Sequence, residues 1–382
     1  MKRVLLRAPV LTLSGYGVHS RQVFEWLETK NIDLTVECLN WGQTPWLLNG
    51  DIDDGLVSRI MSHSKKVEPP YDVSFQLQLP DEWDPKLANY NVGMSAVVET
   101  DKCNPNWVQA CNLMDEIVVP SNFTKNVVKK SGVLLKKITT IPEWFNQNML
   151  TAKPDNYLNL KTDFNFLIIS QLNSISSDDD RKNIFNTIKW VCEEFKDEKV
   201  GVVLKTNFGK NTTIDKSLTK NILGQMLSAI GKKQFPKIYL VHGEMNSKDV
   251  TKLYFDENVS CLVSATRGEG YGLPIIDAAA SALPVVATNW SGHLDFLGDS
   301  FTKVDYTLSE IRKEKVDNRI FLEGLKWAEP SETSFKASIR EVYENLTSKK
   351  ELANSLKEKT VSQFTKTKII NLYNQNFDRV LN

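Results

Sequence analysis

The sequence predicts an α/β protein made of two doubly wound domains, and three observations support this prediction. The chain has 382 residues, which is longer than one hydrophobic core usually serves. Short apolar runs alternate with amphipathic stretches, as buried parallel strands alternate with helices. Polar residues and a proline interrupt this pattern at residues 148–159, which indicates a linker. We therefore expect a first domain at residues 1–150 and a second at 155–362.

Apolar runs bounded by turn residues predict the strands of the first domain. They lie at residues 4–8, 34–39, 73–77, 95–99, 116–119 and 138–141. A loop through Gly15 and Gly17 follows the first strand, and a helix is expected from about residue 20 to 30. Ser121 is expected to cap a later helix.

The second half repeats the alternation. Strands are predicted at residues 166–170, 201–205, 238–242, 260–264 and 284–288, with helices at about 182–195 and 219–230. From about residue 332 to the end the sequence is polar and helical, and a last helix is expected at about 363–382. In such sheets ligands bind beyond the carboxyl ends of the strands, so we expect a cleft there.

Composition excludes several classes of protein. No apolar run reaches about 18 residues, so no membrane-spanning segment is expected. The five cysteines show no CxxC spacing and the four histidines are dispersed, which argues against a disulfide framework and a metal cluster, and favours a cytoplasmic setting. Lys plus Arg and Asp plus Glu number 47 each, so strong polyanion binding is not expected. Five lysines between Lys125 and Lys137 form a local basic run, for which a solvated face, a lipid surface and nucleic acid all remain open.

The most informative stretch is residues 267–273, Arg-Gly-Glu-Gly-Tyr-Gly-Leu, followed by a proline and an apolar run that ends at Asp277. Its glycines permit close backbone approach, and a helix N-terminus offers N–H groups to an anion. Glu269 and Asp277 can accept hydrogen bonds from hydroxyls. A phosphate flanked by hydroxyl-rich groups is the chemistry of a sugar nucleotide.

A second element places cations after the first strand of the second domain. Arg181 and Lys182 precede an amphipathic stretch, and Lys205 ends a strand. Fixed cations favour the growing charge of a departing diphosphate. The three aspartates at residues 178–180 could imitate a cation site, but in a polar loop we expect them to be solvated, so no metal is predicted.

Residues 267–277, continued by Pro-Val-Val-Ala and Ser-Gly-His at 284–293, resemble the donor-site signature of retaining GT-B glycosyltransferases of group 1, which is Glu, seven residues, Glu. Here Asp277 replaces the second glutamate. The resemblance implies that Glu269 lies by the donor sugar and Asp277 binds the ribose hydroxyls. It also implies a donor-binding loop in which backbone groups face the diphosphate or sugar, made of Gly268, Gly270, Tyr271, Gly272 and Leu273.

The same resemblance assigns roles to residues outside this loop. Lys182 matches a family cation at the diphosphate; the match of Arg181 is weaker, because many relatives carry the arginine where Gln171 stands. Gly15 and Gly17 are expected against the donor's phosphate side or the acceptor cleft, with a plain structural loop as the alternative. Glu99 or Asp101 is expected to orient the acceptor hydroxyl, and the last helix to cross back onto the first domain.

The implied activity is transfer of a hexosyl group from a nucleoside diphosphate sugar, with retained anomeric configuration and without cofactor or metal. The acceptor is a hydroxyl of a glycan, of a lipid-linked glycan, or of a hydroxymethylated base in phage DNA. Three alternatives remain open: a sugar-nucleotide epimerase, an NAD-dependent oxidoreductase using the loop at Gly15 as a dinucleotide fingerprint, and an inactive scaffold.

Overall fold

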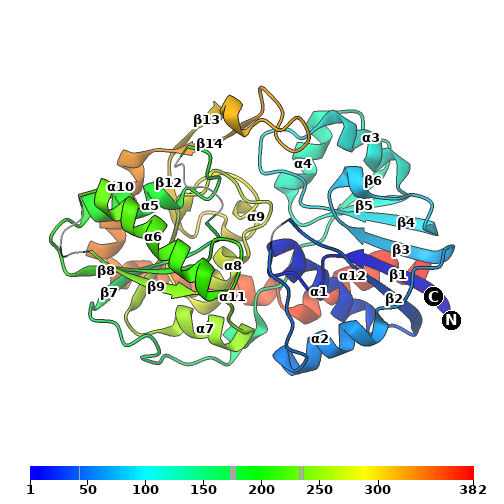
Figure 1. Cartoon of the computed structure of the whole chain (residues 1–382), viewed down its shortest axis with the longest axis horizontal. Helices are drawn as coiled ribbons and strands as arrows, with labels where there is room; N and C mark the ends of the chain where they lie inside the picture. The colour runs from blue at the N-terminus through cyan, green and yellow to red at the C-terminus, as the bar shows by residue number, and fades with distance from the viewer. Residues whose placement is uncertain (43, 173–177, 232–233, 235) are drawn as a thin grey trace. The chain divides into compact units, whose positions relative to one another are not determined.

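The computed structural model describes residues 1–42, 44–172, 178–231, 234 and 236–382. They form two compact α/β units (Figure 1), which confirms the predicted α/β fold class. Unit 1 comprises Met1–Trp144, Asp317–Leu325 and Phe364–Asn382, and unit 2 comprises Phe145–Val316 and Lys326–Gln363. Asp317–Leu325 therefore packs with unit 1, although the expected second domain includes it. No helix among the described residues is long and apolar enough to cross a membrane.

Unit 1 contains a parallel sheet of six strands in the order β2-β1-β3-β4-β5-β6. Because the chain goes from β1 out to β2 and returns to β3 on the other side, the sheet has a switch point between β1 and β3. The strands are β1 (Lys2–Ala8), β2 (Ile32–Cys38), β3 (Tyr71–Leu77), β4 (Ala88–Met94), β5 (Glu116–Val119) and β6 (Lys137–Thr140). The helices are α1 (Gly15–Leu27), α2 (Ile52–His63), the 3₁₀ turn η1 (Pro80–Glu82), α3 (Pro105–Leu113), α4 (Asn122–Ser131) and α12 (Lys366–Leu381).

Helix α1 begins earlier than predicted, because Ser14 caps it. The Ser14 hydroxyl accepts a hydrogen bond from the N–H of Gly17 at 3.0 Å, which fixes the first turn. Gly15 and Gly17 are thus helical, and the predicted loop at this point is wrong. Ser121 caps α4 in the same way, as predicted, through the N–H of Thr124.

The strand predicted at residues 95–99 is also wrong, since β4 ends at Met94. The Tyr16 hydroxyl accepts from the N–H of Ala96 and lies 3.0 Å from the Ser95 hydroxyl, so a side chain replaces the strand partner here. Val97 has a φ of +46°, which turns the backbone out of the extended path. Glu99 and Asp101 therefore stand in irregular chain after the strand.

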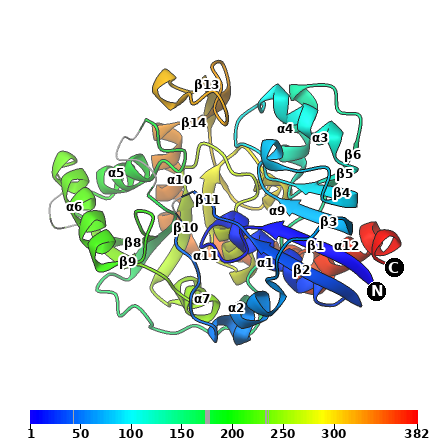
Figure 2. The ribbon, with the colours of Figure 1, turned by 45° about the vertical axis from the view of Figure 1, so that its right-hand side comes forward.

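The C-terminal helix α12 completes the core of unit 1. Tyr373 stacks on Trp26 at a centroid distance of 4.6 Å, and Phe377 meets Phe75 edge-on. Asn374 accepts from the Trp26 indole N–H at 2.9 Å. The red helix lies beside the blue α1 and β1 in both Figure 1 and Figure 2, so the two ends of the chain share one core.

Unit 2 contains a second parallel sheet of six strands, in the order β12-β11-β10-β7-β8-β9. From β7 the chain adds β8 and β9 on one side of the sheet, and it then adds β10, β11 and β12 on the other side. The switch point of this sheet therefore lies between β7 and β10. The strands are β7 (Phe164–Ile169), β8 (Val200–Thr206), β9 (Lys237–His242), β10 (Val259–Ser264), β11 (Val285–Thr288) and β12 (Thr302–Val304). An antiparallel hairpin follows, made of β13 (Tyr306–Glu310) and β14 (Lys326–Pro330).

Helices surround this second sheet. They are η2 (Gln147–Leu150), α5 (Ile184–Glu194), α6 (Thr213–Ala229), α7 (Ser247–Phe255), α8 (Leu273–Ser281), α9 (Leu294–Leu297), η3 (Lys313–Lys315), α10 (Glu332–Glu344) and α11 (Leu346–Gln363). The core joins strand residues such as Phe166 and Val202 to Ile188 of α5 and Phe335 of α10.

Candidate active site

The candidate site lies in unit 2 at the switch point between β7 and β10. Loops that leave neighbouring strands in opposite directions open a crevice at such a point, and ligands bind there in doubly wound sheets. Arg181 and Lys182 follow β7, while Glu269 follows β10. A small cavity of about 20 Å³ lies between them. It is lined by Ile168, Ile169, Ser170, Lys182, Thr187, Leu262, Val263, Ser264, Glu269, Pro274 and Ile275.

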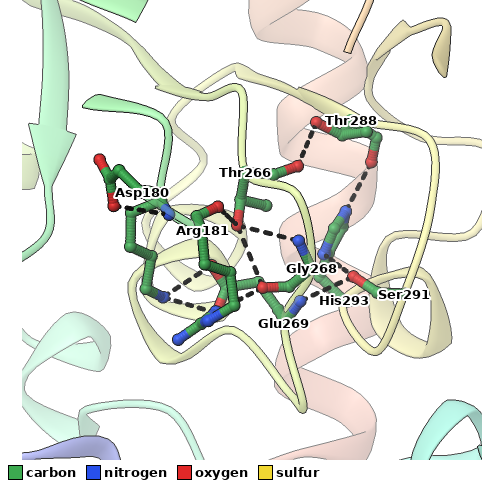
Figure 3. Close-up of polar contacts among 9 residues, drawn as sticks. Asp180, Arg181, Thr266, Gly268, Glu269, Thr288, Ser291 and His293 are labelled. Carbon is green, nitrogen blue, oxygen red and sulfur yellow. Dashed lines mark hydrogen bonds and ion pairs between the residues drawn. The ribbon is translucent and has the colours of Figure 1, made fainter. Parts of the chain in front are cut away.

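Two cations hold the Glu269 carboxylate. The Lys182 ammonium lies 2.7 Å from both carboxylate oxygens, and Arg181 Nη1 lies 3.5 Å from one of them. Arg181 also donates to the carbonyl of Gly268 (Figure 3). Burial acts to raise the pKa of Glu269, but the charges of Lys182 and Arg181 outweigh it and lower the pKa to about 2. Glu269 is therefore an ionised, hydrogen-bond-accepting group at neutral pH.

Asp180 positions Lys182. One oxygen of its carboxylate accepts from the N–H of Lys182 at 3.0 Å, and the other from the N–H of Ile184 at 2.8 Å, which caps the start of α5. Asn183 takes a left-handed conformation with a φ of +55° between them. Asp180 is only 2% exposed. The expectation that the aspartates here are solvated is thus wrong for Asp180.

Arg267 fastens the two loops together and is buried. Its guanidinium forms a two-pronged ion pair with Glu329 of β14, with both N–O distances at 2.7 Å. A further N–H donates to the carbonyl of Asp180 at 2.6 Å. Because its donors face the protein, Arg267 acts as a structural clamp between the loops after β7 and β10.

The backbone of Glu269 is held by residues that sequence reasoning left out. Its N–H donates to the Ser291 hydroxyl at 2.9 Å, and Ser291 lies 3.4 Å from His293 Nδ1. His293 Nε2 lies 2.7 Å from the carbonyl of Thr288, so this nitrogen carries the hydrogen. Ser291 has a φ of +92°, unusual for a residue with a side chain. The Ser-Gly-His triplet at residues 291–293, which belongs to the stretch that carries the resemblance, could have pointed to these residues.

Helix α8 starts beside this cluster without a side-chain cap. Gly272 is its N-cap residue with a φ of +103°, a conformation that favours glycine. Leu273 and Pro274 form the first turn. A Cβ on Gly292 would overlap the carbonyl oxygen of Gly270, so the two backbones are in close contact. The uncapped helix end presents partial positive charge toward an anion. Tyr271 is buried against Phe296, so its ring serves packing.

Asp277 lies one turn further along α8 and has a different environment. One of its carboxylate oxygens accepts from the N–H of Asn146 at 2.8 Å. Burial raises the pKa of Asp277 to about 7, although this hydrogen bond opposes the shift. The second oxygen of the carboxylate retains its accepting capacity for a ligand hydroxyl.

The remaining predicted site residues lie elsewhere. Lys205 is the last residue but one of β8 and donates to the carbonyl of Gly243, and burial lowers the pKa of its ammonium. Gly15, Gly17, Glu99 and Asp101 belong to unit 1. The structure thus brings Arg181, Lys182, Gly268 and Glu269 into contact.

In unit 1 Tyr16 stands between Gly15 and Gly17 in the first turn of α1. Its ring stacks on Trp41 at a centroid distance of 3.9 Å. Burial raises the pKa of Tyr16, and the negative charge of Glu99 adds to this shift. Glu99 is therefore close enough to Tyr16 to act on it electrostatically. In the part of the chain that the structure describes, no three His, Cys, Asp or Glu side chains are placed to hold a metal ion.

Comparison with known proteins gives one family-model match and several similar structures. The family model for glycosyl transferases group 1 matches residues 225–360, which include Glu269 and Asp277. Sucrose-phosphate synthase from Thermosynechococcus elongatus superposes with a TM-score of 0.67 at 12% identity, covering 100% of this chain and 99% of its own. A glycosyltransferase from Rickettsia africae ESF-5 gives a TM-score of 0.66 at 12% identity, covering 100% and 99%.

A third similar structure was solved with a ligand. HepE from Anabaena, in complex with UDP-glucose, gives a TM-score of 0.66 at 10% identity and covers 99% of this chain and 100% of its own. No curated protein sequence matches the chain. At these identities the structures establish the GT-B fold, with two Rossmann-like domains, as predicted.

Proposed function

We propose that this chain, whose residues 225–360 match the family model for glycosyl transferases group 1, moves a hexosyl group from a nucleoside diphosphate sugar to an acceptor hydroxyl with retained anomeric configuration. The observation that carries the proposal is the contact of Arg181 and Lys182 with Glu269 at the switch point of unit 2. A carboxylate and two cations beside an uncapped helix end match a ligand with hydroxyls and a diphosphate.

The cations would serve the leaving group. As the glycosidic bond breaks, negative charge grows on the departing diphosphate, and fixed positive groups stabilise that state more than the ground state. Lys182 and Arg181 would supply this charge, with the N-terminus of α8 at Leu273 adding backbone N–H groups. Since Lys182 is bound to Glu269 in the structure, donor binding would require the diphosphate to share the ammonium.

Glu269 would bind the donor sugar. Its low pKa keeps the carboxylate ionised, so sugar hydroxyls can donate hydrogen bonds to it. Asp277 would accept from the ribose hydroxyls through the oxygen that Asn146 leaves available. Gly268, Gly270 and Gly272 would let the loop approach the donor closely.

Retention in this site would follow a same-face path. A double displacement needs a carboxylate nucleophile close to the anomeric carbon, whereas Glu269 is held by Lys182 and Arg181. We propose that the departing diphosphate instead accepts the proton of the acceptor hydroxyl while that oxygen attacks from the same side. Catalysis would then come from positioning and leaving-group stabilisation, without cofactor or metal.

The acceptor side is assigned to unit 1. Glu99 or Asp101 would orient the attacking hydroxyl, with Gly15 and Gly17 near the donor's phosphate side or the acceptor. We propose a glycan or lipid-linked glycan as acceptor in a cytoplasmic setting, with a hydroxymethylated DNA base as the third class to test. Neutral net charge favours the first two.

The first experiment tests the donor site. UDP-, GDP- and ADP-sugars are compared for thermal stabilisation of the chain, since a ligand that binds the folded state raises its melting temperature. The preferred donor is then used in transfer assays with Lys182→Ala and Glu269→Gln, and with Lys189→Ala on α5, the helix that follows Lys182, as control. We expect both site variants to lose transfer by at least about a hundredfold and the control to keep it. Full turnover by both site variants would refute the assignment.

The rival activities have their own readouts. An epimerase would convert the donor to its epimer in the absence of acceptor, and an oxidoreductase would be stabilised by a nicotinamide dinucleotide. NMR of the anomeric proton before and after transfer distinguishes retention from inversion. Inverted product would rule out the same-face path while leaving the donor site intact.

A further inference from the structure

A surface of unit 1 combines exposed aliphatic side chains with lysines. It is formed by the end of α3, by α4 and by the loop that follows, and Figures 1 and 2 both show α3 and α4 side by side. Leu113, Val133 and Leu135 are 65%, 78% and 77% exposed. We call this the α3–α4 surface, defined by Leu113, Lys125, Lys129, Lys130, Val133, Leu135 and Lys136.

Hydrogen bonds fix the three aliphatic residues beside one another. The Asn112 amide donates to the carbonyl of Val133 at 2.8 Å and accepts from the N–H of Leu135 at 2.7 Å. Leu113 directly follows Asn112 in the chain, so it lies near Val133 and Leu135. Leu134, between the two loop residues, packs against the core of unit 1. The loop is therefore anchored, and its neighbours Val133 and Leu135 extend into solvent.

The chain segment that includes α4 and Leu135 carries only positive charges. Residues 121–137 contain five lysines and no acid. Lys137 is bound to Glu116 at 2.7 Å and is left out of the surface. Across the described residues, the structure shows no ion pair for Lys125, Lys129, Lys130 or Lys136. The carboxylate of Asp115, close in sequence, accepts from the N–H of Asn91.

We propose that the α3–α4 surface docks the protein on a membrane that carries anionic lipids. Lysines attract the negatively charged headgroups, and the exposed aliphatic side chains gain by entering the boundary with the acyl chains. A nucleic acid would satisfy the lysines but would leave Leu113, Val133 and Leu135 in water. A symmetric contact between two copies would bring like charges together. The proposal goes beyond the proposed glycosyl transfer and does not depend on it.

The test is sedimentation of the full chain with phosphatidylcholine vesicles that contain or lack phosphatidylglycerol. We expect binding only to the anionic vesicles, weakened by added salt. Lys129→Gln/Lys130→Gln/Lys136→Gln should reduce the partition coefficient roughly a hundredfold, since each lysine near the surface contributes about 1 kcal/mol, or about fivefold. Val133→Ser/Leu135→Ser should reduce it about tenfold or more without removing the salt dependence.

Matched controls use exposed residues of unit 2, on α6 and α11. Ile214, 81% exposed on α6, is changed to Ser, and Lys216, Lys220 and Lys350 are changed together to Gln. These variants should bind as the parent chain does. An unchanged circular dichroism spectrum and melting temperature in the absence of ligand show that every variant is folded.

Four results would overturn the proposal. They are no binding to anionic vesicles, an equal loss in the control variants, binding of duplex DNA that the lysine variant loses while vesicles remain unbound, and a dimer in sedimentation velocity that Val133→Ser/Leu135→Ser dissociates. None of these readouts uses glycosyl transfer, so the proposal can fail while the proposed function stands, and the reverse.

Discussion

At the residue scale, the candidate site is a set of charges that a few backbone contacts hold in place. Lys182 is set by Asp180 at the start of α5, and Glu269 by Ser291. Arg267 joins the two loops through Glu329 and the carbonyl of Asp180. Arg267 is the first residue of the stretch that resembles the family, yet its role is structural. Arg181, whose match to the family is weaker, contacts Glu269.

The low pKa of Glu269 predicts a pH dependence of stability. Its pKa falls from 4.5 to about 2 on folding, so the folded state binds fewer protons and the ion pair stabilises it above pH 4.5. This stability, on the order of 3 kcal/mol, is lost as the pH falls from about 4.5 to 2. In urea unfolding, Glu269→Gln should therefore be less stable than the parent at pH 6, and the difference should shrink toward pH 2.5.

A surface ion pair provides the comparison. Glu193 lies 2.7 Å from Lys336 but is 35% exposed, so Glu193→Gln should change the free energy of unfolding by no more than about 1 kcal/mol. A Glu269→Gln difference that stays constant between pH 6 and pH 3 would mean that the carboxylate is not held by Lys182 and Arg181 in solution.

At the element scale, the two glycines in the first turn of α1 differ in the space around them. A Cβ on Gly17 would overlap the carbonyl oxygen of Thr12, whereas a Cβ on Gly15 would meet nothing within 4 Å. Gly17→Ala should therefore lower the free energy of unfolding by about 1–3 kcal/mol, and Gly15→Ala should leave it within about 0.5 kcal/mol. Thermal or urea unfolding of the two variants measures this.

The open space beside Gly15 also makes a functional test possible. If a donor or acceptor approaches there, Gly15→Val should reduce transfer while the protein stays folded. Equal stability losses in Gly17→Ala and Gly15→Ala would contradict the observed packing of the first turn. Normal transfer by Gly15→Val would show that Gly15 has no part in binding.

The same elements show what the sequence could predict. Most strands of both sheets are near-continuous apolar runs, so their places followed from hydrophobicity. The start of α1 did not, because Gly15 and Gly17 suggest a loop while Ser14 caps a helix. The end of β4 depends on Tyr16, a residue nearly eighty positions away, and no local pattern reports such a contact. Family resemblance assigned Lys182 and Glu269 to the same donor, but it did not predict the contact between them. Asp180 and Ser291 accept from backbone N–H groups, and Glu329 pairs with Arg267 from a distant strand, so no local sequence pattern shows these contacts.

At the scale of the whole molecule, the chain passes between the two units four times. One of these excursions, Asp317–Leu325, was not predicted, since nine residues without periodicity carry no secondary-structure signal. Arg319 explains its place in unit 1: its guanidinium lies 2.7 Å from Asp81 and 2.6 Å from Glu82. Phe321 packs against the core there. Unit 1 is thus completed by residues made late in synthesis.

This arrangement predicts that removing residues 364–382 unfolds one unit and spares the other. The deletion uncovers Trp26 and Phe75, which Tyr373 and Phe377 cover. Losing four buried residues of α12, at about 1.5–3 kcal/mol each, approaches the whole stability of a domain, about 5–15 kcal/mol. Limited proteolysis should therefore degrade unit 1 and leave a fragment that begins near Phe145.

The truncated protein allows donor binding and glycosyl transfer to be measured separately. Apart from Gly15 and Gly17, the residues assigned to the diphosphate and donor sugar lie in unit 2. A donor that stabilises the full chain should therefore still raise the melting temperature of the truncated protein, while transfer is lost. Tyr373→Phe serves as control: it keeps the ring on Trp26 and removes only the contact of 3.2 Å with His19, so unit 1 should stay folded. Loss of donor stabilisation on truncation, with unit 2 still resistant to protease, would mean that unit 1 supplies part of the donor's binding energy.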